Sequence, residues 1–169
     1  MTDIMTASER SRCMAAVKGK NTRPEMIVRR YLFSRGLRYR VNVGRLPGSP
    51  DIVLKKYRTA IFIDGCFWHA HRGCRYYKLP KTNTQFWRQK VMMNMARDYR
   101  VNVELRCAGW RVIRIWECEL RGAESREKTL RRLYDFITGE GSGGSYETPM
   151  MPDALAGEPE GAYGKHYDE

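Results

Sequence analysis

Residues 49–69 read SPDIVLKKYRTAIFIDGCFWH, and this stretch decides the fold. Two runs of apolar and β-branched residues, 51–54 and 59–64, are separated by the polar segment 55–58, which predicts two strands joined as a hairpin. The second strand runs directly into a cluster of Cys, Trp and His side chains that begins at Gly65. A loop with metal-binding or catalytic chemistry is therefore expected after the second strand.

The segment before this hairpin predicts a helix and a further strand. Thr22-Arg23-Pro24-Glu25 combines a cap residue, a proline in the first turn and an acid three residues after the cap, so a helix is expected from here to about Gly36. A strand over 37–43 and a Gly- and Pro-rich loop over 44–50 follow.

The segment after the hairpin begins with a long irregular loop over 65–81. Compact domains tolerate such loops mainly when they are functional or held by a metal. A helix over about 84–107, a strand over 110–116 and a helix over about 125–137 follow. Because a strand after a crossover helix pairs in parallel, these elements predict a single α/β domain with a mixed central sheet flanked by helices.

Charge divides the chain into three parts. Residues 139–169 hold seven acids and one lysine, so the net charge of +12 becomes +18 for residues 1–138. We expect a basic N-terminal segment over 1–21 that becomes ordered on DNA, a domain over 22–138 and a disordered acidic tail over 139–169. A basic excess interleaved with aromatic residues favours nucleic acid as the partner.

The sequence favours a location inside the cell. The chain has no apolar run near the roughly 20 residues that a membrane span requires. Its N-terminus lacks the long apolar centre of a signal peptide. Five cysteines, an odd number, are better explained as metal ligands or buried thiols in a reducing compartment than as disulfides.

Cys66, His71 and Cys74 have the spacing of a structural zinc site, and thiolate and imidazole are ligands that zinc prefers. The fourth ligand is expected to be Cys118, just beyond the strand over 110–116, with Cys107 as the alternative. Ordinary buried thiols would give the same spacing.

Asp51 stands at the start of the first hairpin strand, where one carboxylate can hold Mg²⁺ while phosphate and water complete the coordination. Endonucleases built on such a hairpin often carry a lysine on the second strand, but residues 61–63 are all apolar. His69 is therefore the candidate proton acceptor, unless it replaces His71 on zinc. Glu25 could assist from the start of its helix, although capping alone explains it.

Phe67 and Trp68 lie inside the candidate zinc loop, and Trp87 opens the long helix. Aromatic wedges can unstack a base step at a cost of about a few kcal/mol, least where pairing is weak, as at a mismatch. Core packing is the alternative for Trp87. Nearby basic residues would contact the phosphates, namely Arg72, Arg75, Lys78, Lys81 and Arg88.

Taken in order, these segments resemble the Vsr family, the very short patch repair DNA mismatch endonucleases. The resemblance covers about residues 8–138 and leaves the tail outside. The motifs that carry it are RSRCM (10–14), TRPE (22–25), LPGSPD (46–51), FIDGCFWH (62–69), LPKTN (79–83), FW (86–87), GWRV (109–112) and IWEC (115–118).

The resemblance implies a restriction-endonuclease-like fold with a structural zinc, and cleavage of one DNA strand 5′ to the thymine of a T:G mismatch left by 5-methylcytosine deamination. It further implies that Asp51 and the main-chain carbonyl of Ile63 bind Mg²⁺, and that His69 is the general base. Glu25 would assist through water or protonated His69. Zinc would be held by Cys66, His71, Cys74 and Cys118. Phe67, Trp68 and Trp87 would enter the DNA base stack beside the mismatch.

By the same resemblance, the protein is a monomer that acts on double-stranded DNA in the bacterial cytoplasm, at the nucleoid. Its partners would be MutL-type repair proteins and a cognate cytosine methyltransferase. Two alternatives stay open, a restriction-like or defence nuclease on the same scaffold and a zinc-stabilised DNA-binding module without catalysis. The residue at 64 varies in the family, so the role of Asp64 is open.

Overall fold

The computed structural model describes residues 6, 8–9, 12 and 19–139. Most of the expected basic N-terminal segment and the tail from residue 140 onward lie outside these residues. The elements in chain order are α2 (Arg23–Ser34), β1 (Arg40–Val41), β2 (Ile52–Leu54), η1 (Lys55–Tyr57), β3 (Thr59–Asp64), α3 (Thr84–Cys107), β4 (Arg111–Trp116), η2 (Glu117–Leu120) and α4 (Ala123–Thr138).

The four strands form one mixed sheet in the order β1-β2-β3-β4. The β2–β3 pair is antiparallel, with Ile52 opposite Ile61, as the hairpin pattern predicts. β3 and β4 are parallel over their full length, from Thr59 opposite Arg111 to Asp64 opposite Trp116. The predicted mixed α/β architecture with flanking helices is confirmed, including the parallel strand after the long helix.

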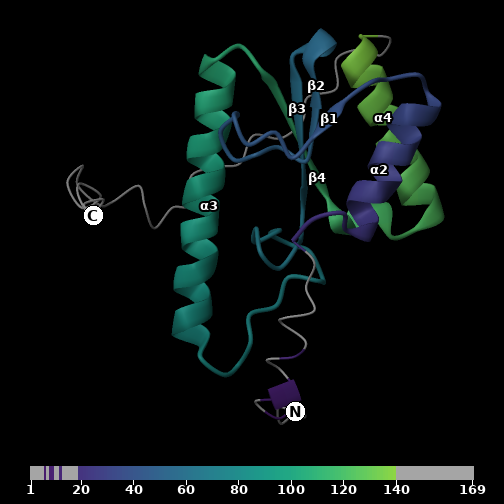
Figure 1. Cartoon of the computed structure of the whole chain (residues 1–169). Helices are drawn as coiled ribbons and strands as arrows, with labels where there is room; N and C mark the ends of the chain where they lie inside the picture. Colours follow the sequence, from purple (N-terminus) through teal and green to yellow (C-terminus); the bar gives the residue numbers. More distant parts are fainter. Residues whose placement is uncertain (1–5, 7, 10–11, 13–18, 140–169) are drawn as a thin grey trace.

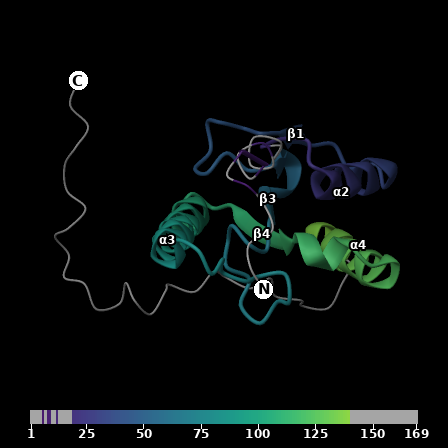
Figure 2. The same cartoon turned by 90° about the horizontal axis from the view of Figure 1, so that it is seen from below.

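Helices cover both faces of the sheet, with α3 on one side and α2 and α4 on the other (Figures 1 and 2). Alternate residues of β3 point to opposite faces. Ile61 packs in the larger core with Leu32 of α2 and Leu133 of α4. Ala60 and Phe62 pack in a smaller core, which includes Leu105 of α3. The sheet is therefore buried on both faces, as expected for a three-layer α/β domain.

The helix over 23–34 begins as its sequence predicts. The Thr22 hydroxyl accepts from the Glu25 amide, and the Glu25 side chain accepts from the Thr22 amide, which completes a capping box. The strand predicted over 37–43 is wrong in extent, because β1 covers only Arg40–Val41. The Leu37 amide still donates to Leu32 at the helix end. At the other end, the Asn42 amide makes one further bond of 3.4 Å to the Asp51 main-chain oxygen, and the positive φ of Asn42, 46°, then turns the chain away from β2.

The long helix α3 is packed unevenly along its length. Its buried residues are Val91, Asp98, Val101, Asn102 and Leu105, mostly in the carboxyl-terminal half. Its amino-terminal half extends beyond the sheet and lies beside the loop that follows β3 (Figure 1). The loop and this half of α3 therefore form an extension built on the carboxyl ends of β3 and β4.

Within the part of the chain that the structure describes, no helix has both the length and the apolar character needed to cross a membrane.

Candidate active site and metal centre

A cleft of about 590 Å³ lies where β2 begins and β3 ends. Five carboxylates, two guanidinium groups and an imidazole line it. They come from α2, the position just before β2, β3, the loop after β3, α3, β4 and η2, and they are Glu25, Asp51, Asp64, His69, Arg97, Asp98, Arg114 and Glu117. Three of them were identified from the sequence as candidate catalytic residues, and the structure brings these three, Glu25, Asp51 and His69, into the same cleft.

Asp51 is held in place by the strand beside it. Its Oδ2 accepts a hydrogen bond of 2.8 Å from the Ile63 amide. The preceding loop lies close to α3, because a Cβ at Gly48 would come within 2.5 Å of Val101 Cγ1 and the Gly48 φ is +69°. Burial, with smaller contributions from the charges of Glu25 and Asp64, raises the Asp51 pKa to about 6. A cation beside this carboxylate would offset those effects.

Glu25 has a structural role in α2 and also faces the cleft. Besides completing the cap, its Oε2 accepts a hydrogen bond of 2.8 Å from Arg29 Nη2. The same nitrogen is 3.4 Å from the main-chain oxygen of Asp51. Arg29 is buried, and Nη1 donates to Asn21 Oδ1 over 2.6 Å. Arg29 thus ties the start of α2 to the start of β2.

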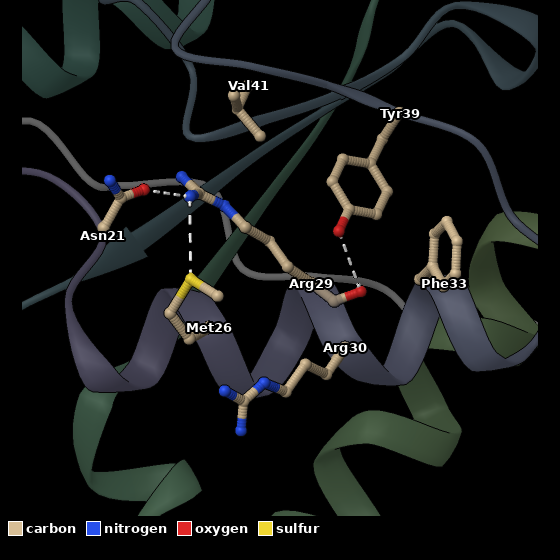
Figure 3. A pocket seen from close by; sticks show the side chains of 7 residues that line it. All are labelled: Asn21, Met26, Arg29, Arg30, Phe33, Tyr39 and Val41. Carbon is tan, nitrogen blue, oxygen red and sulfur yellow. Dashed lines mark hydrogen bonds between the residues drawn. The ribbon is translucent and has the colours of Figure 1, made fainter.

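The outer side of Arg29 forms the floor of a second hollow, of about 550 Å³, between α2 and β1. Figure 3 shows its guanidinium between Asn21 and Met26, while Tyr39 donates to the Arg29 main-chain oxygen. This hollow holds no carboxylate or imidazole. Arg29, which lines this hollow, holds Glu25 and the main chain of Asp51 in position. The residues that line the hollow include no pair that could act as acid and base.

His69 is oriented by Asp98 of α3. The distance from His69 Nδ1 to Asp98 Oδ2 is 2.5 Å, and Asp64 Oδ1 lies 3.8 Å from the same nitrogen. Burial of the ring lowers the His69 pKa, but the bond to Asp98 and the charges of Asp64 and Asp98 outweigh burial, so the net shift is upward. When Nδ1–H donates to Asp98, Nε2 is left as the basic nitrogen. The His69 ring can therefore accept a proton at Nε2, and its raised pKa favours the protonated form.

Arg114 of β4 pairs with the two carboxylates that surround His69. Its Nη1 donates to Asp64 Oδ2 over 2.7 Å, and its Nη2 lies 3.6 Å from Asp98 Oδ1. The sequence left the role of Asp64 open, and the structure shows that its carboxylate pairs with Arg114. The cleft as a whole sets five carboxylates against Arg97, Arg114 and His69, a balance that favours a bound cation.

Asp98, Arg29 and Arg114 were not identified from the sequence. Two signals were present. Val91, Asp98 and Leu105 are spaced by seven residues on the buried side of α3, so Asp98 is a charge on an apolar stripe. Arg114 stands within the otherwise apolar run 112–115 of a buried strand. A charged residue at a core position indicates a buried partner.

A second cluster lies next to the cleft, at the carboxyl ends of β3 and β4. One ligand atom from each of four side chains lies within 4.8 Å of the others, and the four are Cys66, His71, Cys74 and Cys118. His71 Nδ1 is 3.5 Å from Cys66 Sγ and 3.4 Å from Cys118 Sγ. Ligands about 2.3 Å from a tetrahedral zinc stand about 3.8 Å apart, so these side chains fit such an ion.

The surroundings of this cluster are also those of a metal centre. Cys107, the alternative fourth ligand, is exposed at the end of α3 and is not part of the group. The His71 ring stacks on Trp116, with centroids 4.1 Å apart and an interplanar angle of 4°. Burial raises the pKa of the Cys66 and Cys118 thiols, so a metal would have to displace their protons on binding. His69 points to Asp98 and not to this cluster.

The three candidate wedge residues form one aromatic cluster. Phe67 is 5.2 Å from Trp68 and 5.3 Å from Trp87, measured between ring centroids, and Trp68 is 6.0 Å from Trp87. All three rings are partly exposed. Asn94 of α3 fixes the loop by donating to the Trp68 main-chain oxygen over 2.9 Å. The rings thus neither belong to a closed core nor lie free on the surface.

Exposed basic residues lie on the same two segments of the chain as this aromatic cluster. The candidates from the sequence are all exposed, and they are Arg72, Arg75, Lys78, Lys81 and Arg88. They lie on the loop after β3 and on the first turns of α3, the extension in Figure 1. The carboxylate cleft, the aromatic cluster and a basic surface therefore occur at one end of the domain.

Comparison with known proteins accounts for this combination. Residues 2–75 match the family model described as DNA mismatch endonuclease Vsr. The DNA mismatch endonuclease Vsr of Escherichia coli K12 is 41% identical over 88% of this chain and 96% of its own length. The chain belongs to the Vsr family. That family consists of DNA endonucleases, and the resemblance found in the sequence is therefore confirmed.

Other Vsr relatives are named as nicking enzymes. Type II nicking enzyme V.NmeAIP of Neisseria meningitidis is 47% identical over 79% of this chain and 94% of its own length. Type II nicking enzyme V.XorIIP of Xanthomonas oryzae is 44% identical over 80% of this chain and 98% of its own length.

Proposed function

We propose that this protein nicks one strand of double-stranded DNA on the 5′ side of the thymine in a T:G mismatch, with Mg²⁺ as the catalytic ion. The observation that carries the proposal is the pairing of Asp51 with an oriented His69 in one cleft of a Vsr-family chain. Deamination of 5-methylcytosine produces this mismatch, so the role would be very short patch repair.

In this proposal the side chains of the cleft divide the work. Asp51 and the main-chain carbonyl of Ile63 hold the cation. His69 accepts the proton of the attacking water at Nε2 while Asp98 stabilises the charged ring through Nδ1. Glu25 assists by orienting water or by supporting protonated His69. When bound, a divalent cation stabilises the negative charge that develops on the phosphate oxygens during cleavage.

The proposal also assigns a structural role to the cysteine–histidine cluster and a fold family to the domain. We assign Cys66, His71, Cys74 and Cys118 to a structural zinc that fixes the loop after β3. The mixed sheet with Asp51 at the start of one hairpin strand is compatible with a restriction-endonuclease-like fold. Phe67, Trp68 and Trp87 would enter the base stack at the mismatch, and the basic residues around them would bind phosphates.

The proposal is tested with purified protein, Mg²⁺ and end-labelled duplexes that differ only in one base pair. We expect nicking of T:G duplexes at the bond 5′ to the thymine, and no nicking of the same duplex with T:A or C:G. Flanking sequences should be varied, because the surrounding context sets the cognate site. Equal cleavage of paired DNA would favour a restriction-like or defence nuclease, and binding without cleavage would favour a non-catalytic module.

Replacing Trp68 with Ala is expected to reduce mismatch discrimination about tenfold, because stacking on an aromatic ring contributes roughly 1–3 kcal/mol per base. Binding to fully paired duplex, which depends on phosphate contacts, should change less than about threefold. The measurement is the ratio of dissociation constants for T:G and T:A duplexes.

Phe33→Ala is the matched control for this test. Phe33 is also an exposed aromatic residue, with 57% of its surface accessible, but it lies on α2 beside the second hollow. Its replacement should leave the T:G to T:A ratio unchanged. If Trp68→Ala leaves the ratio of the T:G and T:A dissociation constants unchanged, Trp68 does not act as a wedge.

A further inference from the structure

We propose that Arg114 is a positioning residue for His69. It holds the carboxylates of Asp64 and Asp98 on the Nδ1 side of the ring, and so keeps the imidazole turned with Nε2 toward the cleft. The inference rests on the proposed function, since it adds a residue to the same site, and it also assigns Asp64 to Arg114 and not to the metal.

The sheet register places Arg114 for this role. In the parallel pair, Arg114 lies opposite Phe62, and Asp64 is two residues further along the same face of β3. The Arg114 guanidinium lies over the Phe62 ring at 4.6 Å from its centroid. Its side chain is 7% exposed. The guanidinium therefore has one apolar support and points along the strand toward Asp64.

One guanidinium contacts both acids that surround His69. Nη1 is bonded to Asp64 Oδ2 at 2.7 Å, while Nη2 is 3.6 Å from Asp98 Oδ1 and 3.5 Å from the Asp98 main-chain oxygen. The other oxygen of each acid faces the ring, Asp98 Oδ2 at 2.5 Å and Asp64 Oδ1 at 3.8 Å from Nδ1. The two carboxylates therefore lie between the Arg114 guanidinium and the His69 imidazole, and each contacts both.

Removing Arg114 would leave two buried carboxylates close to one imidazole, and the remaining guanidinium contact would be that of the exposed Arg97, 3.9 Å from Asp98 Oδ1. Asp64 and Asp98 side chains are only 5% and 10% exposed, so solvent could not replace the guanidinium. Their repulsion would then be relieved by movement, and each could compete for Nδ1. The His69 ring would no longer have a single orientation, although the surface that contacts DNA would be unaltered.

The test compares Arg114→Met and Arg114→Lys with Arg111→Met. Methionine keeps an unbranched apolar side chain over Phe62 but carries no charge, and lysine keeps the charge without the two-pronged donor geometry. Arg111 is a matched control on the same strand. It donates to the main-chain oxygens of Phe136 and Ile137 at the end of α4 and does not line the cleft.

Three quantities are measured on the full-length protein: the dissociation constant for T:G duplex, the single-turnover nicking rate with Mg²⁺, and the His69 Nδ1 proton resonance by NMR without DNA. For Arg114→Met we expect a rate loss of about 10–100-fold, the usual effect of removing a partner that orients a catalytic group. The dissociation constant should change less than about twofold, and the downfield Nδ1 proton signal should broaden or vanish.

Arg114→Lys should recover part of the rate and of the signal, and Arg111→Met should keep both at wild-type level even if its melting temperature falls. Asp64→Asn, which keeps an oxygen for Arg114, should lose no more activity than Arg114→Met. The proposal is overturned by an unchanged rate and Nδ1 signal in Arg114→Met, by equal losses in Arg111→Met, or by complete inactivation in Asp64→Asn.

These outcomes are separable from failure of the proposed function. If the wild-type protein nicks no duplex, the nuclease proposal fails, but the Nδ1 resonance still decides whether Arg114 orients His69. If Arg114→Met does not fold, the comparison of Arg114→Lys with wild type gives the same decision, because lysine should weaken the Nδ1 signal and the rate together.

Discussion

Asp51→Asn is expected to lower the single-turnover nicking rate at least about 1000-fold while mismatch binding is retained. Loss of metal-dependent charge stabilisation is worth several kcal/mol in the transition state, and each 1.36 kcal/mol is about a factor of ten. Asparagine keeps an oxygen that can accept from the Ile63 amide, the hydrogen bond of 2.8 Å that fixes residue 51. The fold should therefore be preserved.

The same substitution is expected to stabilise the metal-free protein at neutral pH. Because burial raises the Asp51 pKa from 3.8 to about 6, the folded protein favours the protonated carboxyl. The contribution of this group to stability is complete below about pH 4 and is lost as pH rises through about 6. The melting temperature of Asp51→Asn should thus exceed that of wild type at pH 8, and the difference should shrink toward pH 4.

The effect of Mg²⁺ on the melting temperature tests the role of the Asp51 carboxylate independently of catalysis. A ligand that binds only the folded state raises the melting temperature, so Mg²⁺ should stabilise wild type at pH 8 and have little effect on Asp51→Asn. Asp135→Asn is the matched control, since it makes the same chemical change on α4, outside the cleft. Retained turnover in Asp51→Asn, or an equal Mg²⁺ response, would contradict the metal role.

Cys118→Ser is expected to remove bound zinc and to lower nicking about 100-fold, the typical cost of misplacing catalytic groups by about 1 Å. Cys118 is the only member of the cysteine–histidine cluster that does not belong to the loop after β3. The side chains of Phe67, Trp68 and His69 lie between Cys66 and His71 in the sequence. Their positions should therefore depend on the tie between the loop and the end of β4.

Two measurements follow the loss of zinc directly. Native mass spectrometry should find one zinc ion per wild-type chain and none in Cys118→Ser. Limited trypsin digestion should then cut the mutant within residues 72–81, where Arg72, Arg75, Lys78 and Lys81 are exposed. Cys107→Ser is the control, because Cys107 is an exposed thiol outside the cluster. A zinc-free protein with full activity would rule out this role.

Local signals allowed most of the fold to be predicted from the sequence. The cap at Thr22, the two apolar runs around 55–58 and the long helical pattern over 84–107 each depend on neighbouring residues, and each corresponds to an element of the structure. The strand over 37–43 was predicted too long, because its length depends on pairing with β2. Apolar pattern alone does not limit such pairing.

Most of the site residues predicted from the sequence lie close together in it, and Glu25, Trp87 and Cys118 are the distant exceptions. Residues 49–74 supply Asp51, His69 and three members of the metal cluster, so spacing and residue type identified them. Asp98 and Arg114 approach His69 only because α3 crosses the sheet and β4 pairs in parallel with β3. Their signals, a charge on an apolar stripe and a charge within a buried strand, predict a partner but not which one.

Under the proposed function, the packing of Phe67, Trp68 and Trp87 has a consequence for the speed and cost of mismatch recognition. The three rings contact one another across two separate segments of the chain, with centroids 5.2–6.0 Å apart. Their side-chain freedom is therefore lost largely during folding. A probe that meets each base step in its final shape can sample many steps quickly, and its residence time is then set by how easily each step opens.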